Sequence, residues 1–404
     1  MGVELVVGQI LLVVAMALCG LILNRLLKID NSLGCLLVGV AAGWLVPQWG
    51  IDTGIRANNL QDLVFYLLLP ILIFEAVWHI EPGDLKRWLK PILLLASVGV
   101  VLSTLFSAVL IYYGINHPSG FPWIAALICG VVLATTDPVI TTAKLEQHKA
   151  PKGLITLIKG ESLFSDATTI VLFSLLIAIA THSASSSNLS ISTFFISVFM
   201  GGLILGGIMG LIAAILTLLL ASHSTTRIVL LFAAVGSFYL AKNIFEVSGI
   251  MAVMGTAIVA RMCLNEKEHS FLLGADGNWH WLALLFSSIL FVLMGLVITP
   301  DMFSHQWLAI LIGIGAAILS RSATIFICTI ASIPFSHSIQ KNWKGVLIWG
   351  DIRGVVAIAL VLTLPTSLSY WWTIQSIVFG VVLFNLLIQA PTSRWLIRKI
   401  TADE

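Results

Sequence analysis

The stretch that decides the fold is LICGVVLATTDPVITTAKL, residues 127–145. It is apolar enough to lie within a membrane, yet Pro138 has no backbone N–H and disfavours helical geometry at the preceding Asp137. We therefore expect the helix to open near residues 135–138. Non-helical backbone at that depth leaves carbonyl oxygens without helical partners, and such oxygens can coordinate a cation when they line a cavity.

A second apolar stretch, GVLIWGDIRGVVAIALVL (residues 345–362), is interrupted in a comparable way. Gly350 and Gly354 weaken the helix and predict a break near residues 350–354. A pair of interrupted segments at matching positions of two halves is the best sequence indication of a transport site.

The composition agrees with a membrane location. The 404 residues are 59% hydrophobic and only 10% charged, whereas an ordinary soluble domain carries about 25% charge. A net charge of +2 is too small to suggest nucleic-acid binding. The sequence predicts an all-α polytopic protein with thirteen transmembrane segments in the lipid bilayer. These are residues 3–23, 32–47, 60–80, 91–113, 121–143, 153–180, 192–220, 226–245, 248–263, 281–299, 306–333, 343–365 and 371–393.

Most of the 21 basic residues fall in alternate loops, which predicts the cytoplasmic side by the positive-inside rule. The N-terminus is then outside and the C-terminus cytoplasmic, as expected for a multi-pass protein of the cytoplasmic membrane. The basic residues Arg394, Arg398 and Lys399 follow the last segment. We expect residues 1–404 to form one transmembrane unit without a soluble C-terminal domain.

Thirteen segments divide into two sets of six around a linker. Residues 1–180 form the first predicted repeat, residues 192–220 the linker helix, and residues 226–398 a second repeat inserted with inverted topology. The linker contains MGGLILGGIMG (residues 200–210). Its glycines favour close helix packing; a flexible hinge is the alternative.

The predicted site combines the first break with GESLFSD, residues 160–166. Ser162 and Asp166 are i, i+4 neighbours on one helical face, and Glu161 and Ser165 form the adjacent pair. A carboxylate, hydroxyls and free carbonyls supply the all-oxygen surroundings that a hard cation prefers.

Several charged residues allow two interpretations. Asp137 either caps the half-helix that follows it or also binds the ion. Glu161 and Arg353 form a structural ion pair across the repeat interface, with direct ion coordination as the alternative. Glu75 is a cavity-wall residue or an outer ligand, and Arg321 ties two helices together.

These motifs resemble those of the NhaP/NHE-type monovalent cation/proton antiporters. GESLFSDATTIVLF is similar to the family's GESLxND signature, TTDPV to its unwound TDP segment, and WGDIRGVVAIALVLTLP to its GLRGAVSLALALSLP element. LLPILIFEA, GIMAVMGTAIVARM and SRSATIF also match, in the family's order, across about residues 64–365.

The resemblance implies a homodimer of thirteen-helix subunits. In each, a six-helix core with two crossed, broken helices moves against a dimerisation domain. Asp166 matches the family's essential transport aspartate, and Glu161 and Arg353 match its buried ion pair. The positions that line or coordinate the cation are matched by Thr136, Asp137, Ser162 and Glu75, so that Na⁺ is expected at Asp166, Ser162, Thr136 and Asp137.

Two residues depart from the family pattern. Ser165 stands where the family normally has Asn and electrogenic relatives have Asp. Because serine does not titrate in the physiological range, we expect electroneutral one-for-one exchange. Asp351 replaces a smaller residue, and it either alters cation preference or pairs with Arg353.

The expected function is exchange of Na⁺ or Li⁺ for H⁺ by alternating access, with Na⁺ and H⁺ competing for Asp166 and supporting pH homeostasis. No cofactor is expected beyond these transported ions. Potassium/proton antiport is the alternative within the same mechanism. An ion channel and an intramembrane serine hydrolase built on Ser162 are disfavoured, since no His falls mid-span and the GxSxG motif is absent.

Overall fold

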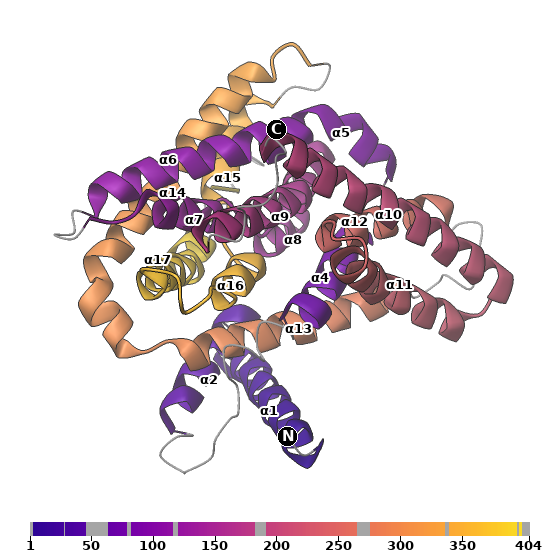
Figure 1. Cartoon of the computed structure of the whole chain (residues 1–404), viewed down its shortest axis with the longest axis horizontal. Helices are drawn as coiled ribbons and strands as arrows, with labels where there is room; N and C mark the ends of the chain where they lie inside the picture. Colours follow the sequence, from indigo (N-terminus) through magenta and orange to yellow (C-terminus); the bar gives the residue numbers. More distant parts are fainter. Residues whose placement is uncertain are drawn as a thin grey trace.

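The computed structural model describes residues 3–27, 29–45, 64–78, 82–115, 120–181, 191–264, 275–335, 339–393 and 396–397. The described backbone is mostly helical and contains no strand, as the all-α prediction requires (Figure 1). The predicted loop residues Lys28, Arg56, Lys267, Arg394, Arg398 and Lys399 lie outside the described residues.

The elements follow one another along the chain as α-helices, with the short π-helical turns η2, η3 and η6 and the 3₁₀ turn η5 between or after them. Up to residue 180 they are α1 (Val3–Leu27), α2 (Asn31–Leu45), η2 (Val64–Leu68), α4 (Leu69–Trp78), α5 (Pro82–Leu94), η3 (Leu95–Gly99), α6 (Val100–Gly114), α7 (Trp123–Leu133), α8 (Val139–Gln147) and α9 (Lys152–Ala180). They continue with α10 (Ile191–Leu220), α11 (His223–Asn243), α12 (Gly249–Cys263), α13 (Ala275–Val297), α14 (Pro300–Ala331), η5 (Lys341–Trp343), α15 (Lys344–Trp349), α16 (Val355–Leu362), α17 (Trp371–Phe384) and η6 (Asn385–Gln389).

Each of the thirteen predicted segments overlaps a helix, a broken pair of helices or a helix joined to a π-helical turn among the described residues. Among the described residues, seven helices are long and apolar enough to cross a membrane, and shorter apolar helices accompany them. The chain is therefore a polytopic membrane protein. The count of thirteen crossings and the boundaries of the inverted repeats stay predictions.

The fourth segment begins earlier than predicted. The prediction started at residue 91, whereas α5 begins at Pro82 and continues through η3 into α6. Its first turns carry Asp84, Lys86 and Arg87, which resemble a polar loop in a hydropathy profile. A helix with charges on one face and apolar residues on the other is equally compatible with a membrane surface.

The helices form two groups (Figure 1). In the first group, which we call the core group, α5 to α9 and α14 to α17 pack on one another. In the second, the flanking group, α10, α11 and α12 pack together, α12 also packs on α4, and α1, α2 and α4 pack around α13. Contacts between the groups are fewer and run mainly from α13 to α16 and from α4, α10 and α12 to α9.

The linker helix α10 packs closely on α12. A side chain at Gly202, Gly206 or Gly210 would collide with backbone carbonyl oxygens of α12. At this contact the Thr256 hydroxyl lies 3.1 Å from the carbonyl oxygen of Gly206. The glycines of MGGLILGGIMG thus allow close helix packing, which is the first of the two interpretations offered by the sequence.

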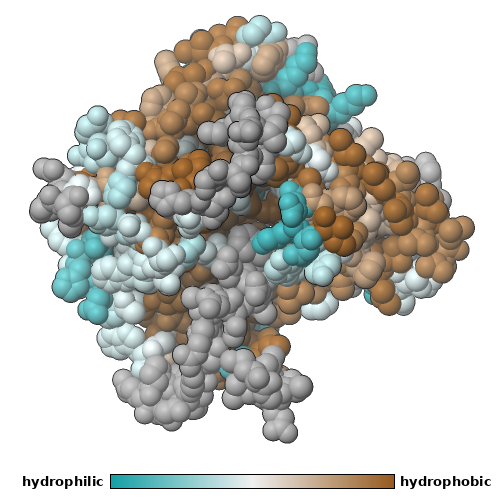
Figure 2. All heavy atoms as spheres, in the orientation of Figure 1, coloured by the Kyte–Doolittle hydropathy of each residue, from teal (hydrophilic) through white to brown (hydrophobic). Residues whose placement is uncertain are grey.

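The outer surface of the α10–α11 limb is strongly apolar. Figure 2 shows hydrophobic residues gathered over this end of the molecule, and large side chains such as Ile204, Phe232 and Leu219 are more than half exposed there. Such a surface is stable against lipid rather than water.

Candidate ion-binding site at the crossed helix breaks

The first predicted break lies between α7 and α8, at residues 134–138. Ser162 on α9 donates its hydroxyl hydrogen to the carbonyl oxygen of Thr136 over 2.6 Å. The Ser165 hydroxyl donates to the carbonyl oxygen of Ser162 at 3.0 Å and lies 3.1 Å from the Thr136 hydroxyl. A hydroxyl has one hydrogen, so Thr136 is the donor to Ser165. Ser162 therefore holds the open backbone at Thr136, and Ser165 holds the Thr136 side chain.

The second predicted break lies between α15 and α16, and the two breaks touch. The backbone N–H of Asp137 donates to the carbonyl oxygen of Ile352 at 2.7 Å, an isolated bridge between the two non-helical segments. Thr141 on α8 donates its hydroxyl hydrogen to the carbonyl oxygen of Gly350 at 2.5 Å. The open backbone of each segment is thus partly satisfied by the other segment, as buried peptide groups require.

Two arginines lie at the C-terminal ends of the half-helices. Arg353 donates through Nε to the carbonyl oxygen of Leu133, the last residue of α7, at 3.0 Å. Arg321 on α14 donates in the same way to the carbonyl oxygen of Leu347 near the end of α15, at 3.0 Å. Positive charge is favourable at these ends because unpaired carbonyls concentrate negative potential there. Each break is therefore stabilised electrostatically by a guanidinium group.

Asp137 lies at the N-terminal end of the other broken helix. Its Oδ2 accepts a hydrogen bond from the backbone N–H of Val355, the first residue of α16, at 3.3 Å. The predicted capping role is thus present, but the capped half-helix is α16 rather than α8. Gly354 makes this contact possible, since a Cβ at that position would lie 2.6 Å from Cγ and 2.7 Å from Cβ of Asp137.

We predict that Gly354→Ala displaces the Asp137 carboxylate and uncaps α16. Misplacing a site residue by even 1 Å can reduce activity by a large factor, so for the cation exchange expected from the sequence the apparent KM for the cation should rise about tenfold or more. The measurement is the cation dependence of exchange in proteoliposomes. Gly315→Ala in α14 is the matched control, because nothing lies within 4 Å of an added Cβ there. An unchanged KM for Gly354→Ala would contradict the capping geometry.

Four buried charges form a cluster beside the crossing. Arg321 Nη1 lies 2.5 Å from Glu161 Oε1, and Arg321 Nε lies 3.1 Å from Asp351 Oδ2. Arg353 Nη1 also lies 3.1 Å from Asp351 Oδ2 and donates to the backbone oxygen of Asp351 at 2.8 Å. The cluster holds two acids and two bases, so its formal charge cancels, which a low-dielectric interior requires.

The predicted pairing of Glu161 with Arg353 is therefore corrected. Glu161 pairs with Arg321, and Arg353 pairs with Asp351. The physical reason is proximity: Asp351 precedes Arg353 by two residues on the same non-helical segment and neutralises it locally. Arg321 from α14 is then the guanidinium that reaches Glu161 on α9. Of the two interpretations of Asp351, pairing with Arg353 is the one that the structure shows.

Asp166 lies on α9 one turn beyond Ser162. Its Oδ1 is buried and has no hydrogen-bond partner, while the backbone N–H of Thr136 is a donor to the carboxylate. Asp137 exerts the larger like-charge repulsion on this carboxylate and Asp351 a smaller one. A buried carboxylate oxygen without a partner is unfavourable, and a bound cation or proton would relieve it.

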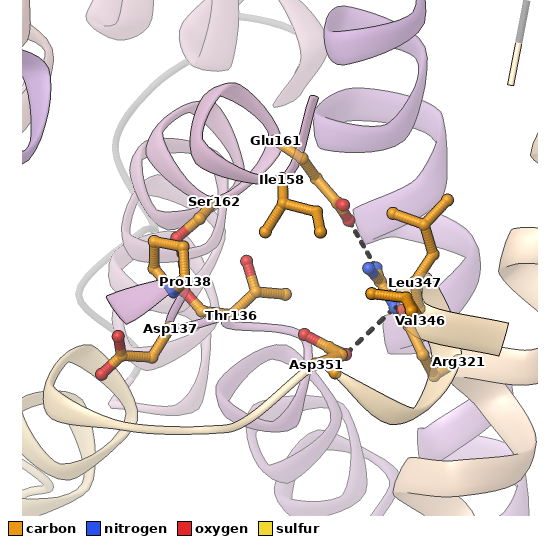
Figure 3. Close-up of a pocket in the computed structure, with 11 residues that line it drawn as sticks. Thr136, Asp137, Pro138, Ile158, Glu161, Ser162, Arg321, Val346, Leu347 and Asp351 are labelled. Carbon is orange, nitrogen blue, oxygen red and sulfur yellow. Dashed lines mark hydrogen bonds and ion pairs between the residues drawn. The ribbon is translucent and has the colours of Figure 1, made fainter. Parts of the chain in front are cut away.

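A small cavity of about 10 Å³ lies between the break and the charge cluster, enough for about one water-sized sphere. Figure 3 shows Glu161, Arg321 and Asp351 turned toward one another across it. It is lined by Thr136, Asp137, Pro138, Ile158, Glu161, Ser162, Arg321, Val346, Leu347, Gly350 and Asp351. The structure thus brings most of the predicted site residues together, with Asp166 beside them. Glu75 lies half-buried on α4 in the flanking group, outside this lining.

Two residues at this site were not predicted from the sequence. Asn385 and Gln389 on η6 contact the second break, with Gln389 Nε2 donating to the carbonyl oxygen of Trp349 at 2.9 Å. The available signal was the i, i+4 spacing of two amides in an otherwise apolar span, since an amide at such depth needs a partner.

Two broken helices that meet at their open segments, surrounded by buried carboxylates in a polytopic fold, define an ion-transporting membrane protein rather than an enzyme. The model of the family described as "Sodium/hydrogen exchanger, transmembrane" matches residues 12–399. The chain therefore belongs to this family, and the resemblance inferred from the motifs is confirmed.

Two relatives illustrate the similarity. The chain is 32% identical over 353 residues to the "Na(+)/H(+) antiporter ApNhaP" of Aphanothece halophytica, covering 86% of this chain and 66% of that protein. It is 30% identical over 406 residues to the "Low-affinity Na(+)/H(+) antiporter NhaS1" of Synechocystis, covering 96% of this chain and 74% of that protein. The chain thus spans only part of the length of both.

A solved structure shares the fold. The sodium proton antiporter MjNhaP1 from Methanocaldococcus jannaschii, determined at pH 8, matches with a TM-score of 0.84. The match covers 98% of this chain and 99% of that chain at 18% sequence identity. The antiporter-like architecture predicted from the sequence is therefore confirmed at the level of the fold.

Proposed function

We propose that this protein exchanges Na⁺ for H⁺ across the membrane and that the two ions compete for Asp166. The observation that carries the proposal is the Asp166 carboxylate, whose Oδ1 is buried without a hydrogen-bond partner beside the first helix break. The names of the related proteins, which are Na⁺/H⁺ antiporters, support the same ion pair. Either ion neutralises the carboxylate, and an empty, ionised carboxylate resists passage through a region of low dielectric constant.

The cation ligands in this proposal are oxygens on the two elements that meet at Asp166. The hydroxyl oxygens of Thr136 and Ser162 keep lone pairs after donating their hydrogens. Asp137 adds negative charge nearby, while its Oδ2 caps α16. Carboxylate and hydroxyl oxygens are the ligands that a hard monovalent cation accepts. Glu75, on α4, is proposed as an outer residue of the ion pathway.

The proposed stoichiometry is one Na⁺ for one H⁺. Ser165, which precedes Asp166, is engaged with Thr136 and Ser162 and does not titrate in the physiological range. Asp351 lies against two guanidinium groups and Glu161 against one, so both acids are held as ion-pair partners within a cluster whose formal charge cancels and are not counted as exchangeable groups. A single exchangeable carboxylate carries one charge in each direction, which makes the exchange electroneutral.

Alternating access is proposed to arise from movement between the two helix groups. A cavity of about 380 Å³ lies between α9 and the segment that follows α16 (Thr363 and Pro365) in the core group and α10, α11 and α12 of the flanking group. Its lining includes Ile170 on α9, one helical turn beyond Asp166. On the predicted topology it opens to the outside of the cytoplasmic membrane. In this proposal the flanking group also forms the homodimer contact.

The alternatives differ in their support. A K⁺/H⁺ antiporter uses the same residues and is distinguished only by measurement, because selectivity depends on the size of the oxygen cage. The serine hydrolase interpretation is disfavoured by the structure, because the Ser162 hydroxyl donates to a backbone carbonyl oxygen rather than to a base.

The test is exchange in proteoliposomes that contain the purified protein. An imposed Na⁺ gradient should move protons, detected with a pH-sensitive dye, and Li⁺ and K⁺ gradients measure preference. The rate should be unchanged when valinomycin and K⁺ set the membrane potential at different values. Proton movement driven only by K⁺ would favour the alternative ion, and a rate that follows the potential would contradict one-for-one exchange.

A further inference from the structure

Two amide side chains of the last span are buried against the second helix break. α17 continues into the π-helical turn η6, which begins at Asn385 and ends at Gln389. Asn385 is 1% exposed and Gln389 is 2% exposed. A π-helical turn inside a long helix is rare and frequently marks a functional site.

Gln389 satisfies carbonyl oxygens that the broken helix leaves open. Its Nε2 donates to the carbonyl oxygen of Trp349 at 2.9 Å and to that of Asp351 at 3.3 Å. The first carbonyl ends α15, and the second belongs to the non-helical segment itself. Without Gln389, these two acceptors lose a donor in the interior of a membrane protein, where few others are available.

Asn385 completes the contact from the other side of the break. With its amide oriented to satisfy both groups, Oδ1 accepts from the backbone N–H of Arg353 at 2.7 Å. Its nitrogen donates to Gln389 Oε1 at 2.6 Å and to the carbonyl oxygen of Val381 at 3.2 Å. The two amides therefore act as one unit, and together they fix both Asp351 and Arg353 through the backbone.

The first break is contacted by a polar pair on α9: Ser162 donates to the carbonyl oxygen of Thr136, and the Ser165 hydroxyl lies against the Thr136 hydroxyl. In the predicted inverted repeats, α9 is the last helix of the first repeat and α17 with η6 the last helix of the second. Each break is thus held by a polar pair from the final helix of its own repeat. On α9 the serine pair is followed by the ion-binding candidate Asp166. The amide pair on η6 has no such carboxylate after it, so its role is limited to positioning the second break.

We propose that Asn385 and Gln389 are positioning residues for ion binding. They set the shape of the second break, and the break passes this shape to the site through the bond between Ile352 and the backbone N–H of Asp137. Asp137 in turn acts electrostatically on Asp166, and Thr136, the residue before it, donates its backbone N–H to the Asp166 carboxylate. This inference rests on the proposed exchange function, because it assigns the amides to the same ion-binding site.

The test compares Gln389→Met with Gln375→Met. Methionine keeps the length and flexibility of glutamine but offers no hydrogen-bond donor. Gln375 is the matched control, since it is buried on α17 and its Oε1 has no hydrogen-bond partner. Two readouts are used: the apparent KM for Na⁺ in proteoliposomes, and the Na⁺ concentration that raises Tm in detergent by a fixed amount. A ligand at free concentration c that binds the folded state stabilises it by RT ln(1 + c/Kd), so the concentration needed for a fixed rise follows Kd.

For Gln389→Met we expect both Na⁺ concentrations to rise about tenfold or more, as misplacement of a binding site does. The control should stay within about twofold of wild type, as substitutions away from such contacts do. A merely structural role would lower the Tm measured without Na⁺ and leave both concentrations unchanged, which would overturn the proposal. If Gln389→Met does not accumulate in the membrane, Gln389→Asn, which keeps the amide on a shorter stem, takes its place, and wild-type values for that variant overturn the proposal equally.

The outcome for the wild type separates this inference from the proposed function. If the wild type exchanges Na⁺ and the Gln389 variant gives the same values as the wild type, only the role of the amides is overturned. If the wild type responds to K⁺ instead, the same comparison is made with K⁺. A wild type that responds to no monovalent cation overturns both proposals.

Discussion

Asp166→Asn is expected to abolish cation-driven proton movement. Asparagine matches aspartate in size, and its amide oxygen can still accept the hydrogen bond from the backbone N–H of Thr136, so the fold should be retained. The amide neither titrates nor carries the charge that binds a cation. Loss of a proton-exchanging group typically reduces rates by about a hundredfold or more. The measurement is dye-detected exchange, together with loss of the Na⁺-induced rise in Tm.

Two further variants give this result its meaning. Asp84→Asn changes the charge by the same amount in the first turn of α5, away from the breaks, and should exchange like wild type. Asp137→Asn keeps an oxygen that can cap α16, and we expect a weakened but measurable activity.

In the wild type, the apparent KM for Na⁺ should rise as the pH falls, while the rate at saturating Na⁺ is maintained. Substantial exchange by Asp166→Asn would mean that another carboxylate carries the ions.

Both helix breaks were predictable from the sequence because their causes are local. Pro138 lacks an N–H and constrains the residue before it, and Gly350 and Gly354 weaken a helix wherever it lies. The structure contains the second break at the predicted residues 350–354 and the first at residues 134–138, one residue earlier than predicted. The hydroxyls of GESLFSD were predictable for a related reason, since the i, i+4 spacing alone places Ser162 and Asp166 on one helical face.

The pairing of the four buried charges was not predictable in this way. Which guanidinium reaches Glu161 depends on the relative tilt of α9, α14 and the non-helical segment, and no local rule fixes that tilt. Asp351 is recognisable from the sequence as an unusual acid and a candidate partner of Arg353, but only the structure shows that this pairing leaves Glu161 to Arg321. The direction of the Asp137 cap is a similar case, because the capped helix comes from the other repeat.

Arg321→Met is expected to destabilise the protein more than any other change to the charge cluster. Arg321 contacts both Glu161 and Asp351, so its removal leaves two buried carboxylates facing the single guanidinium of Arg353. Breaking a buried ion pair by removing one partner costs about 3–5 kcal/mol. The measurement is the thermal unfolding midpoint of the purified protein in detergent. Lys159→Met is the control, since the pair between Lys159 and Glu146 is partly exposed and such pairs contribute at most about 1 kcal/mol.

A compensating double variant separates charge balance from packing. Arg321→Met combined with Glu161→Gln removes both members of the pair and leaves Asp351 with Arg353, so the cluster is neutral again. Replacement of a whole buried pair by uncharged groups is often nearly neutral, so the double variant should recover more than half of the stability lost by Arg321→Met alone. The carbonyl oxygen of Leu347 still lacks its donor, which limits the recovery. If the two substitutions instead add their destabilising effects, Arg321 acts by packing and by its bond to α15 rather than by balancing Glu161.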